Sequence, residues 1–347
     1  MRISLLVAML ATAAAMAGAQ ANSLPAPGFH HLHLNSTNPE AAIAFYTKQF
    51  PSTEKSIFAG QPALKTGSVY VLFNKVSKPP KSPLNGGPQT AIWHFGWHVT
   101  DERADLARFQ QSGDVKLLPL YTGDGEASVL VSSDTWPGTG RSLGLTRAQI
   151  AEAKAKGVKP LGGAGFAYMQ GPDNALIEYQ GNMPRERFNH VHMYQEEPLC
   201  AQVWYVTHLN AKAREGTVTR SESDCRTHLS QERGEESWPA LDKTGMLRSL
   251  TGGVTFDDVA LNWYPNPSYA PGPSRPLAPT RGQLYDHFAL SVADLDAWTA
   301  KLRKEKVRFI GKPYQLGDLR AVMIEGPSHE AIELVEVKGG SNTGDKK

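Results

Sequence analysis

The chain lacks the features that would assign it at once to several classes of protein. Its 36 Lys and Arg residues nearly balance its 34 Asp and Glu residues, so the formal net charge is only +2, and no block of basic residues is present. This argues against a nucleic-acid partner, because surfaces that bind phosphate are basic. With 40% hydrophobic and 20% charged residues, the composition is that of an ordinary soluble globular protein.

Cysteine is also scarce, with only Cys200 and Cys225. Neither their number nor their spacing indicates a zinc-thiolate site. Cys200 lies in a predicted helix and Cys225 in the polar segment that follows it. The two can pair in an oxidising compartment, but a single buried thiol on a helix is also common. The sequence leaves both alternatives open.

Long hydrophobic runs are absent after the N-terminus. Residues 1–21 contain one basic residue, Arg2, then an apolar run, then small residues that match the A-x-A cleavage pattern twice. This pattern predicts a signal peptide and export to the periplasm or the medium. An uncleaved anchor is the alternative, but the run is shorter than the ~20 residues that span a bilayer. We therefore expect no membrane attachment after cleavage.

What the sequence does contain is a long repeat. FHHLHLNSTNPEAAIAFY (29–46) matches FNHVHMYQEEPLCAQVWY (188–205), and in each a His precedes a Pro by eight residues and a Tyr by fifteen. The matched residues are His31, Pro39 and Tyr46, then His190, Pro198 and Tyr205. A period of 159 residues is far longer than the ~20–50 residues of a solenoid repeat, so each copy is expected to be a domain.

Each copy contains two units that begin with a strand and a helix. The second unit begins with AIWHFGWHVTDERADLARF in the first copy and with LYDHFALSVADLDAWTAKL in the second. About three strands follow each of these segments. We therefore expect an α+β chain of four βαβββ units, with neighbouring units paired into domains 22–183 and 184–338, and a disordered tail at 339–347. Residues 122–163 do not fit this plan and are interpreted as an insertion that acts as a lid or binding loop.

Ionisable residues recur at matched strand positions. Each unit has a His on its first strand, and each half has a Glu in its closing turn and strand (GPDNALIE and GPSHEAIE). A Glu on an apolar strand is costly unless it is paired or binds metal, and two imidazoles with one carboxylate form a metal triad with open positions. The expected sets are His31, His94 and Glu178 in the first half, and His190, His287 and Glu333 in the second.

Six motifs in order resemble the vicinal oxygen chelate superfamily, which includes glyoxalase I, extradiol dioxygenases and bleomycin-resistance proteins. The motifs are HLHLNSTNPEAAIAFY, HFGWHVTDERADL, GPDNALIEY, HVHMYQEEP, HFALSVADLDAW and GPSHEAIEL. The resemblance implies that paired βαβββ units curl into two cup-shaped domains with a metal inside each. It also implies that the His and Glu residues above are the ligands.

The resemblance implies a further ligand position on the last strand of the first unit of each half. Counting back four residues from Asn74 reaches Tyr70, and the same count from Asn262 reaches Asp258, with Asp257 as the alternative. We therefore expect three protein ligands at the first site and four, including Asp258, at the second.

Similarity to the extradiol dioxygenases also implies a Tyr about ten residues before the Glu ligand. Tyr168 stands ten residues before Glu178. The usual acid/base His is missing from this region, and His33 and His98 are the candidates to replace it. Alternatively, these two residues pack against the insertion or orient the ligands.

The sequence thus predicts an exported metal-dependent enzyme that acts on a small oxygenated molecule. The simplest interpretation is a ring-cleaving or related dioxygenase that uses Fe(II) in the first half of the chain. A glyoxalase-type lyase or isomerase with Zn, Mn or Ni is one alternative, and a non-enzymatic protein that binds a small ligand is the other. Four units complete two cups in one chain, so no oligomer is required.

Overall fold

The computed structural model describes residues 24–82, 85–118, 120–121, 128–134, 136, 147–226, 251–265 and 276–338. The expected signal peptide and tail, and much of the expected insertion, lie outside the described residues. Among the described residues, no helix combines the length and apolar character needed to cross a bilayer.

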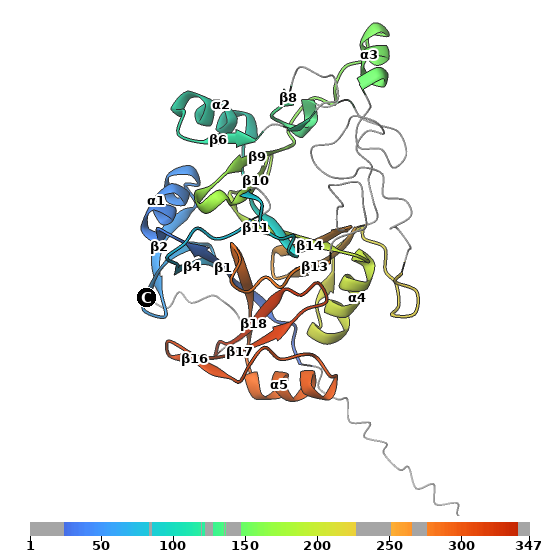
Figure 1. Ribbon diagram of the computed structural model, residues 1–347. Coiled ribbons are helices and arrows are strands. Elements are labelled where there is room, and N and C mark those ends of the chain that lie inside the picture. Colours follow the sequence, from blue (N-terminus) through green and yellow to red (C-terminus); the bar gives the residue numbers. More distant parts are fainter. Residues whose placement is uncertain are drawn as a thin grey trace, which may run out of the picture.

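Two eight-stranded sheets form the molecule (Figure 1). In order, the first contains β16 (Tyr314–Leu316), β17 (Leu319–Glu325), β18 (Ala331–Glu336), β15 (Tyr285–Val292), β1 (Gly28–Ser36), β4 (Val69–Lys75), β3 (Gln61–Thr66) and β2 (Thr53–Phe58). In order, the second contains β12 (Lys212–Ala213), β13 (Gly252–Phe256), β14 (Val259–Pro265), β11 (Arg187–Gln195), β5 (Ile92–His98), β10 (Leu176–Gln180), β9 (Phe166–Gln170) and β6 (Lys116–Leu118). We call them the β1–β15 sheet and the β5–β11 sheet after their central strands.

The helices follow the first strand of each unit. They are α1 (Pro39–Gln49), α2 (Glu102–Ser112), α4 (Pro198–Leu209) and α5 (Leu295–Lys304). The side chains of Asn38, Asp101 and Asp294 cap α1, α2 and α5 by accepting backbone N–H groups at 3.1, 3.0 and 2.8 Å. The expected α+β architecture of four βαβββ units in two curled sheets is therefore confirmed.

The pairing of the units differs from our expectation. The first unit shares a sheet with the fourth, and the second with the third, whereas we expected neighbours to pair within each half. The lengths of the connections explain this. Only residues 181–186 join β10 to β11, so both strands lie beside β5, while the long linkers 76–91 and 266–284 lead into the other sheet. The assignment of ligands by halves is therefore wrong.

One hydrophobic core joins the two sheets. The Phe29 ring of β1 lies 5.7 Å from Phe188 of β11 and 6.1 Å from Phe288 of β15, measured between centroids. The repeated Tyr residues belong to this core. Tyr46 of α1 lies 5.7 Å from Trp97 of β5, and Tyr205 of α4 lies 6.5 Å from Phe288 of β15. The repeat thus marks the contact between the sheets as well as the ligand strands.

The edge hairpins distinguish the sheets. In the β1–β15 sheet, β2 and β3 are joined by Ala59–Gly60, and β16 and β17 by Gly317–Asp318. The two turns touch, since a Cβ added at Gly317 would lie 2.9 Å from the Ala59 Cα. In the β5–β11 sheet, the corresponding connections are residues 119–165 and 214–251. Both long insertions of the chain therefore belong to one sheet.

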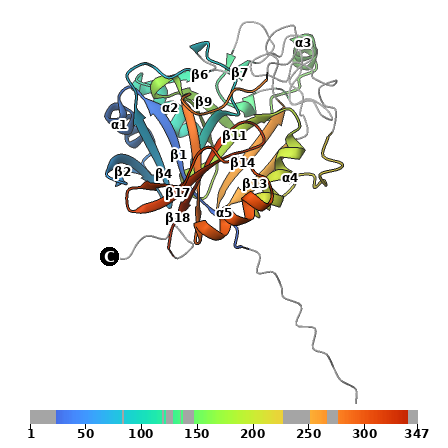
Figure 2. The same cartoon turned by 60° about the horizontal axis from the view of Figure 1, so that its bottom comes forward.

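The first insertion, 119–165, contains short elements of its own. They are β7 (Leu120–Tyr121), β8 (Ser128–Val129), the 3-10 helix η2 (Ser132–Asp134) and α3 (Arg147–Ala155). Figures 1 and 2 both place α3 apart from the two sheets. Arg103 of α2 holds this insertion by pairing with Asp134 at 2.7 Å and donating to the Gly163 carbonyl at 2.9 Å.

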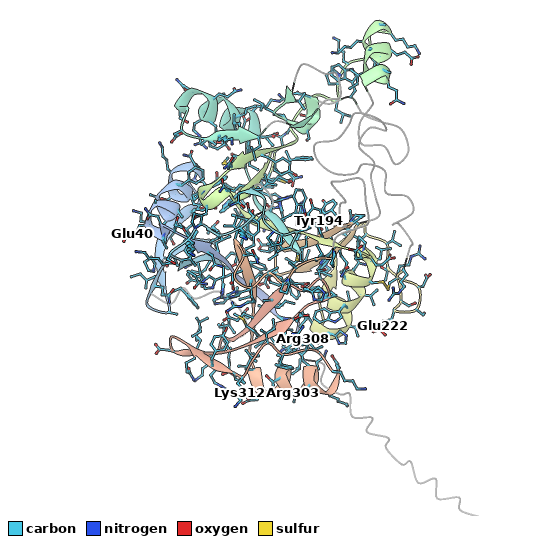
Figure 3. All side chains as sticks on the ribbon, in the orientation of Figure 1. Glu40, Tyr194, Glu222, Arg303, Arg308 and Lys312 are labelled. Atoms are coloured by element: carbon cyan, nitrogen blue, oxygen red, sulfur yellow. A yellow bond between two sulfur atoms is a disulfide. The ribbon has the colours of Figure 1, made fainter. Side chains whose placement is uncertain are left out.

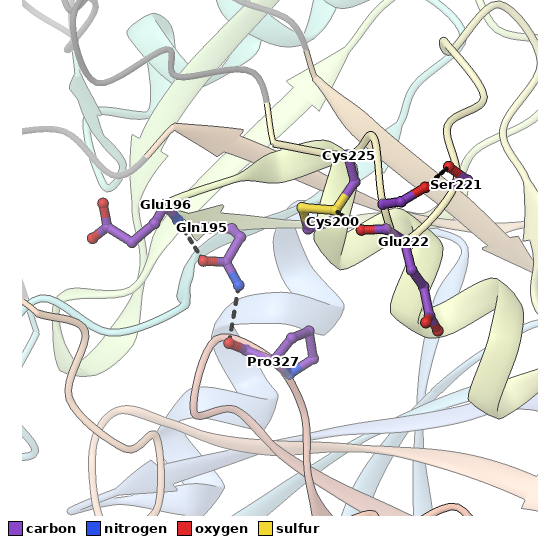
Figure 4. The surroundings of a disulfide bond; sticks show 8 residues. Gln195, Glu196, Cys200, Ser221, Glu222, Cys225 and Pro327 are labelled. Carbon is purple, nitrogen blue, oxygen red and sulfur yellow. Dashed lines mark hydrogen bonds between the residues drawn. A yellow bond between two sulfur atoms is a disulfide. The ribbon is translucent and has the colours of Figure 1, made fainter.

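A disulfide anchors the second insertion. Cys200, in the first turn of α4, is bonded to Cys225 (Figure 4). Of the two alternatives that the sequence left open, the cysteines form the pair. The Gln202 side chain adds a second anchor, because its Nε2 donates to the Val218 carbonyl at 3.0 Å.

Candidate metal centres

Each sheet gathers His and Glu side chains on its central strands. His94, Glu178, His190 and His192 offer ligand atoms that all lie within 4.8 Å of one another, and we call this group the β5–β11 cup. His31, His33 and His287 form the matching group, and Glu333 lies beside them; we call these four the β1–β15 cup. The six expected ligands are thus brought together, but His94 joins His190 and His31 joins His287.

In the β5–β11 cup, one carboxylate lies between two imidazoles. The Nε2 of His94 is 3.3 Å from Oε2 of Glu178, and the Nε2 of His190 is 3.6 Å from its Oε1. All three side chains are buried. The strands β5, β10 and β11 are adjacent, so each contributes one of these groups.

The β1–β15 cup repeats this arrangement. The Nε2 of His31 is 3.2 Å from Oε2 of Glu333, and the Nε2 of His287 is 3.8 Å from the same oxygen. His33 is aligned directly with His287 across the sheet, as His192 is aligned with His94. The match extends to the strand register.

A β-bulge precedes the ligand on each first strand. The register of β1 with β15 shifts between Phe29 and His31, and that of β11 with β5 shifts between Phe188 and His190. The extra residues are His30 and Asn189. A bulge turns a side chain out of the strand alternation, and both side chains contact the Nδ1 of the next residue. These contacts are 2.8 Å from His30 to His31 and 3.0 Å from Asn189 to His190.

A partner at Nδ1 orients an imidazole so that its Nε2 faces the cup. His287 has such a partner in Asp286, whose Oδ1 lies 2.6 Å from its Nδ1. Asp286 is itself bonded to Arg281 and accepts the Gly282 N–H at 2.7 Å. These groups stabilise its carboxylate and, against the effect of burial, lower its pKa to about 2. His94 has Trp93 in the matching position instead.

The donor atoms fit a divalent metal ion. The Nε2 atoms of His31, His94, His190 and His287 are buried, and each faces an oxygen of Glu178 or Glu333 at 3.2–3.8 Å without hydrogen-bond geometry. Burial lowers the pKa of His31 and His94, and lowers that of His190 to about 3 despite the nearby Glu178. Neutral imidazoles keep the lone pair that a metal requires, and buried polar atoms without partners call for an ion.

A Tyr contacts each Glu, although from different strands. Tyr168 of β9 is aligned with Glu178 and shares a hydrogen bond with it, as expected for a residue ten positions earlier. Tyr314 of β16 donates to Glu333 Oε1. Burial raises the pKa of Glu178, whereas the neighbouring His31, His287 and Tyr314 outweigh burial and lower the pKa of Glu333 to about 2. Sequence reasoning missed Tyr314, because Met323 stands at the position that corresponds to Tyr168.

Asp258 is not a ligand in this arrangement, and that prediction is withdrawn. It lies in the turn between β13 and β14, partly exposed, where it pairs with Arg185 at 2.9 Å and with Arg187. The register shows the cause of the error. Tyr70 is aligned with His31, and Ala260 with His190, so the residue that matches Tyr70 is Ala260.

Asp257, the alternative to Asp258, lies outside both cups. The three expected catalytic residues do not lie together in one cup. Asp257 accepts the Phe29 N–H at 3.2 Å and does not reach a cup. His33 belongs to the β1–β15 cup, while Tyr168 belongs to the β5–β11 cup. His98 lies at the end of β5, aligned with Arg187, outside the close group. His192, which the sequence showed only as a repeat of His33, joins the β5–β11 cup.

Aromatic side chains line the β5–β11 cup. Trp93 stacks on Tyr194 with centroids 5.1 Å apart and rings 13° from parallel, and Tyr194 comes from β11 (Figure 3). Tyr264 meets the edge of Trp93 at 6.2 Å and lies 5.0 Å from His192. Val129, from the first insertion, packs with Trp93 in the apolar cluster around Tyr168. The insertion therefore contributes to the surroundings of this cup.

Comparisons with known proteins agree with this architecture. A family model described as the Glyoxalase/Bleomycin resistance protein/Dioxygenase superfamily matches residues 187–334. The fold is similar to that of glyoxalase I from Zea mays, at 12% identity and a TM-score of 0.52, over 89% of this chain and 92% of that one. It is also similar to a candidate dioxygenase from Bacillus subtilis, at 8% identity and a TM-score of 0.51, over 90% and 86%. No curated protein matches the chain by sequence.

Proposed function

Because the chain belongs to the Glyoxalase/Bleomycin resistance protein/Dioxygenase superfamily, we propose that it is a metal-dependent enzyme acting on a small oxygenated molecule. The proposed reaction is ring cleavage or a related dioxygenation, and the proposed active centre is the β5–β11 cup. This moves the expected activity from the first half of the chain to a centre that the second and third units build together.

One observation carries the proposal. Beside the triad of His94, Glu178 and His190, the β5–β11 cup holds a third imidazole, His192, and the Tyr168 phenol. Three protein ligands leave open positions for a substrate and a second small molecule. Proton transfer then needs a nearby base and acid, and His192 and Tyr168 are the groups that the cup offers.

The metal would be held by His94, His190 and Glu178. A divalent ion there, with Fe(II) favoured, would polarise adjacent oxygens of the substrate and allow reaction with dioxygen. His192 would take the proton from a substrate hydroxyl, because its ring lies beside both imidazoles of the triad, with centroids 4.4 Å from His94 and 4.3 Å from His190. Tyr168 would hold Glu178 in place through their hydrogen bond, and Trp93 would exclude water from one side.

The β1–β15 cup is proposed to bind metal without turnover. Phe58 lies 6.0 Å from the His31 ring, and Tyr314 occupies the oxygen of Glu333 that faces β16. The turns of the edge hairpins meet at Ala59 and Gly317. These contacts bring the two edge hairpins of this sheet together, which supports the proposal that this cup receives no substrate.

Anaerobic reconstitution with Fe(II), Mn(II) or Zn(II), followed by oxygen uptake with a panel of catechols, tests the activity. We expect uptake with Fe(II) and none with Zn(II). No uptake with any metal would remove the dioxygenase proposal. Turnover of a hemithioacetal with Zn or Ni and without oxygen would favour the lyase alternative, and tight ligand binding without turnover would favour a binding protein.

We also propose that the mature chain is exported, as residues 1–21 predict. The Cys200–Cys225 disulfide supports this, because such bonds persist in oxidising compartments. The mass of the N-terminal peptide of protein isolated from the periplasm or medium tests it. A chain that keeps Met1 would contradict cleavage.

A further inference from the structure

We propose that Arg214 is an anion anchor of the β5–β11 cup and that the substrate is an aromatic compound that carries a carboxylate. The choice of cup rests on the proposed function above. The anchor itself rests on a row of residues that crosses the sheet, on the matching row of the other sheet, and on the aromatic side chains beside it.

The row leads from Arg214 to the ligands. Arg214 follows β12, and its N–H donates to the Gly253 carbonyl at 2.8 Å. Its Nη1 donates to Oδ1 of Asn262 at 2.9 Å. Asn262 is aligned with His192 on β11, and His192 with His94 on β5. Because neighbouring strands lie ~4.8 Å apart, the guanidinium is held a few strand widths from the ligands.

Gly253 makes this placement possible. A Cβ at this position would lie 2.8 Å from Asn262 Oδ1 and 3.2 Å from the Arg214 Cβ. Any other residue would therefore push the arginine away from the asparagine. The side chain of Arg214 crosses the sheet through space that only a glycine leaves free.

The β1–β15 sheet has a different row at the same register. Leu72 is aligned with His33, Ala63 with Leu72, and Ser56 with Ala63. These three residues stand where Asn262, Gly253 and Arg214 stand in the other sheet. No charge is present in this row, so the arginine is a feature of one cup and not of the repeated plan.

The charge of Arg214 is left for a ligand. Arg214 forms no ion pair with any carboxylate of the residues that the structure describes, and its side chain is exposed. A guanidinium binds a carboxylate through two parallel hydrogen bonds, and one of its nitrogens is already fixed by Asn262. A guanidinium fixed in this way needs little further ordering when an anion binds.

Aromatic residues beside Asn262 indicate that the ligand contains an aromatic ring. Tyr264 lies two residues beyond Asn262 on β14, 5.0 Å from His192, and Trp93 stacks on Tyr194 beside it. Flat side chains that border the metal ligands favour a planar ring, which stacks on them. A ring placed here could direct its carboxylate to Arg214 and its hydroxyl groups to His192.

Binding assays on the full chain test the anchor without turnover. Calorimetry would measure the Kd of 3,4-dihydroxybenzoate, benzoate and catechol for wild type, Arg214→Gln and Lys212→Gln. Lys212 is an exposed lysine of β12, so its substitution removes the same charge two residues away. We expect Arg214→Gln to weaken both carboxylated probes about 10- to 100-fold and to leave catechol unchanged. Lys212→Gln should bind all three as wild type does.

The outcomes separate the anchor from the reaction. If Arg214→Gln binds the carboxylated probes as tightly as wild type, or if wild type does not prefer 3,4-dihydroxybenzoate to catechol, the anchor is overturned. Loss of preference in Arg214→Gln with no oxygen uptake by wild type would keep the anchor and remove the dioxygenase. Oxygen uptake by wild type together with equal Kd values for catechol and 3,4-dihydroxybenzoate would keep the dioxygenase and overturn the anchor.

Discussion

In the β1–β15 sheet the edge hairpins turn within two residues and touch each other, whereas in the β5–β11 sheet the same two connections are residues 119–165 and 214–251. The strands between them align the same ligand residues in the same register. Duplication thus kept the ligand strands, while length was added only at the edges of one sheet. This difference supports our proposal that one cup receives a substrate and the other does not.

The residues that contact the imidazoles of His287 and His94 also differ between the two cups. His287 is held by Asp286 and Arg281, which are charged, while His94 lies against Trp93. A fixed carboxylate strengthens a metal ligand, and an aromatic ring provides a surface for an organic ligand. These contacts agree with our proposal that the β1–β15 cup retains an ion and that the β5–β11 cup binds an organic molecule beside one.

The largest expected effect is the loss of one metal ion per cup. Glu178→Ala and Glu333→Ala should each weaken one of two binding events about 100-fold or more, because each removes the only carboxylate of its triad. Equilibrium dialysis with elemental analysis would count the ions. Glu330→Gln, a buried glutamate outside both triads, is the control and should keep two. A Glu178→Ala protein that still binds two ions would refute the triad.

The next effect concerns the disulfide that anchors the second insertion. Cys225→Ser should lower the free energy of unfolding by ~3 kcal/mol, since the bond closes a loop across a sequence separation of 25 residues. Guanidinium unfolding with and without reductant would measure it. Reductant should destabilise wild type alone and leave the Cys200→Ser/Cys225→Ser protein unchanged. Equal stability of reduced and oxidised wild type would speak against an anchoring role.

A matched pair of tyrosines then compares the cups in turnover. Tyr168→Phe should lower kcat about 10- to 100-fold, because it removes the hydrogen bond to Glu178 and the phenol beside the triad. Tyr314→Phe removes the corresponding bond to Glu333 and should change kcat less than about threefold. Initial rates of oxygen uptake measure both. Equal losses would mean that the two cups act together.

The smallest effect concerns the contact of α4 with the turn before Glu333. Tyr205→Phe should cost ~1–3 kcal/mol of stability, because the Tyr205 hydroxyl donates to the buried Glu330 at 2.6 Å. Tyr46→Phe is its counterpart in the repeat, where Ala175 stands in place of Glu330. Thermal unfolding should show a smaller loss there. A larger loss in Tyr46→Phe would contradict this assignment.

Burial of Glu330 also makes the stability of the protein depend on pH. Burial raises the pKa of its carboxyl from 4.5 to about 7, with hydrogen bonds from Tyr205 opposing the shift. A pKa above the unfolded value means that the stabilising contribution is complete below pH 4.5 and is lost as the pH rises through about 7. Unfolding free energies between these pH values should fall for wild type and fall less for Glu330→Gln. Parallel pH profiles would exclude the contribution of this group.

The sequence predicts the units and their six ligands because each unit repeats the same local pattern. A His on a first strand and a Glu on a closing strand are visible without knowledge of the neighbour. The pairing of units was read incorrectly, although residues 181–186 held the signal, since a connection this short keeps its two strands in one sheet.

Long-range register explains the remaining errors. Asp258 was assigned by taking Asn262 as equivalent to Asn74, while the sheet aligns Asn262 with His192 and Leu72 with His33. A shift of two residues leaves each side chain on the same face of the strand. The alternation of side chains therefore does not reveal the error. Tyr314 reaches Glu333 from an outer strand that has no counterpart in the motif. Such a contact depends on the curl of the sheet and has no local sequence pattern.

The assignment of catalysis to one cup is tested most directly by two matched substitutions. His94 and His287 are the proposed ligands at equivalent positions of the second and fourth units, and each is buried. Oxygen uptake by Fe(II)-reconstituted His94→Ala and His287→Ala would be measured with the same catechol as wild type. We predict that His94→Ala loses activity by about 1000-fold or more and that His287→Ala keeps it within about threefold. Activity that survives in His94→Ala and disappears in His287→Ala would contradict the assignment.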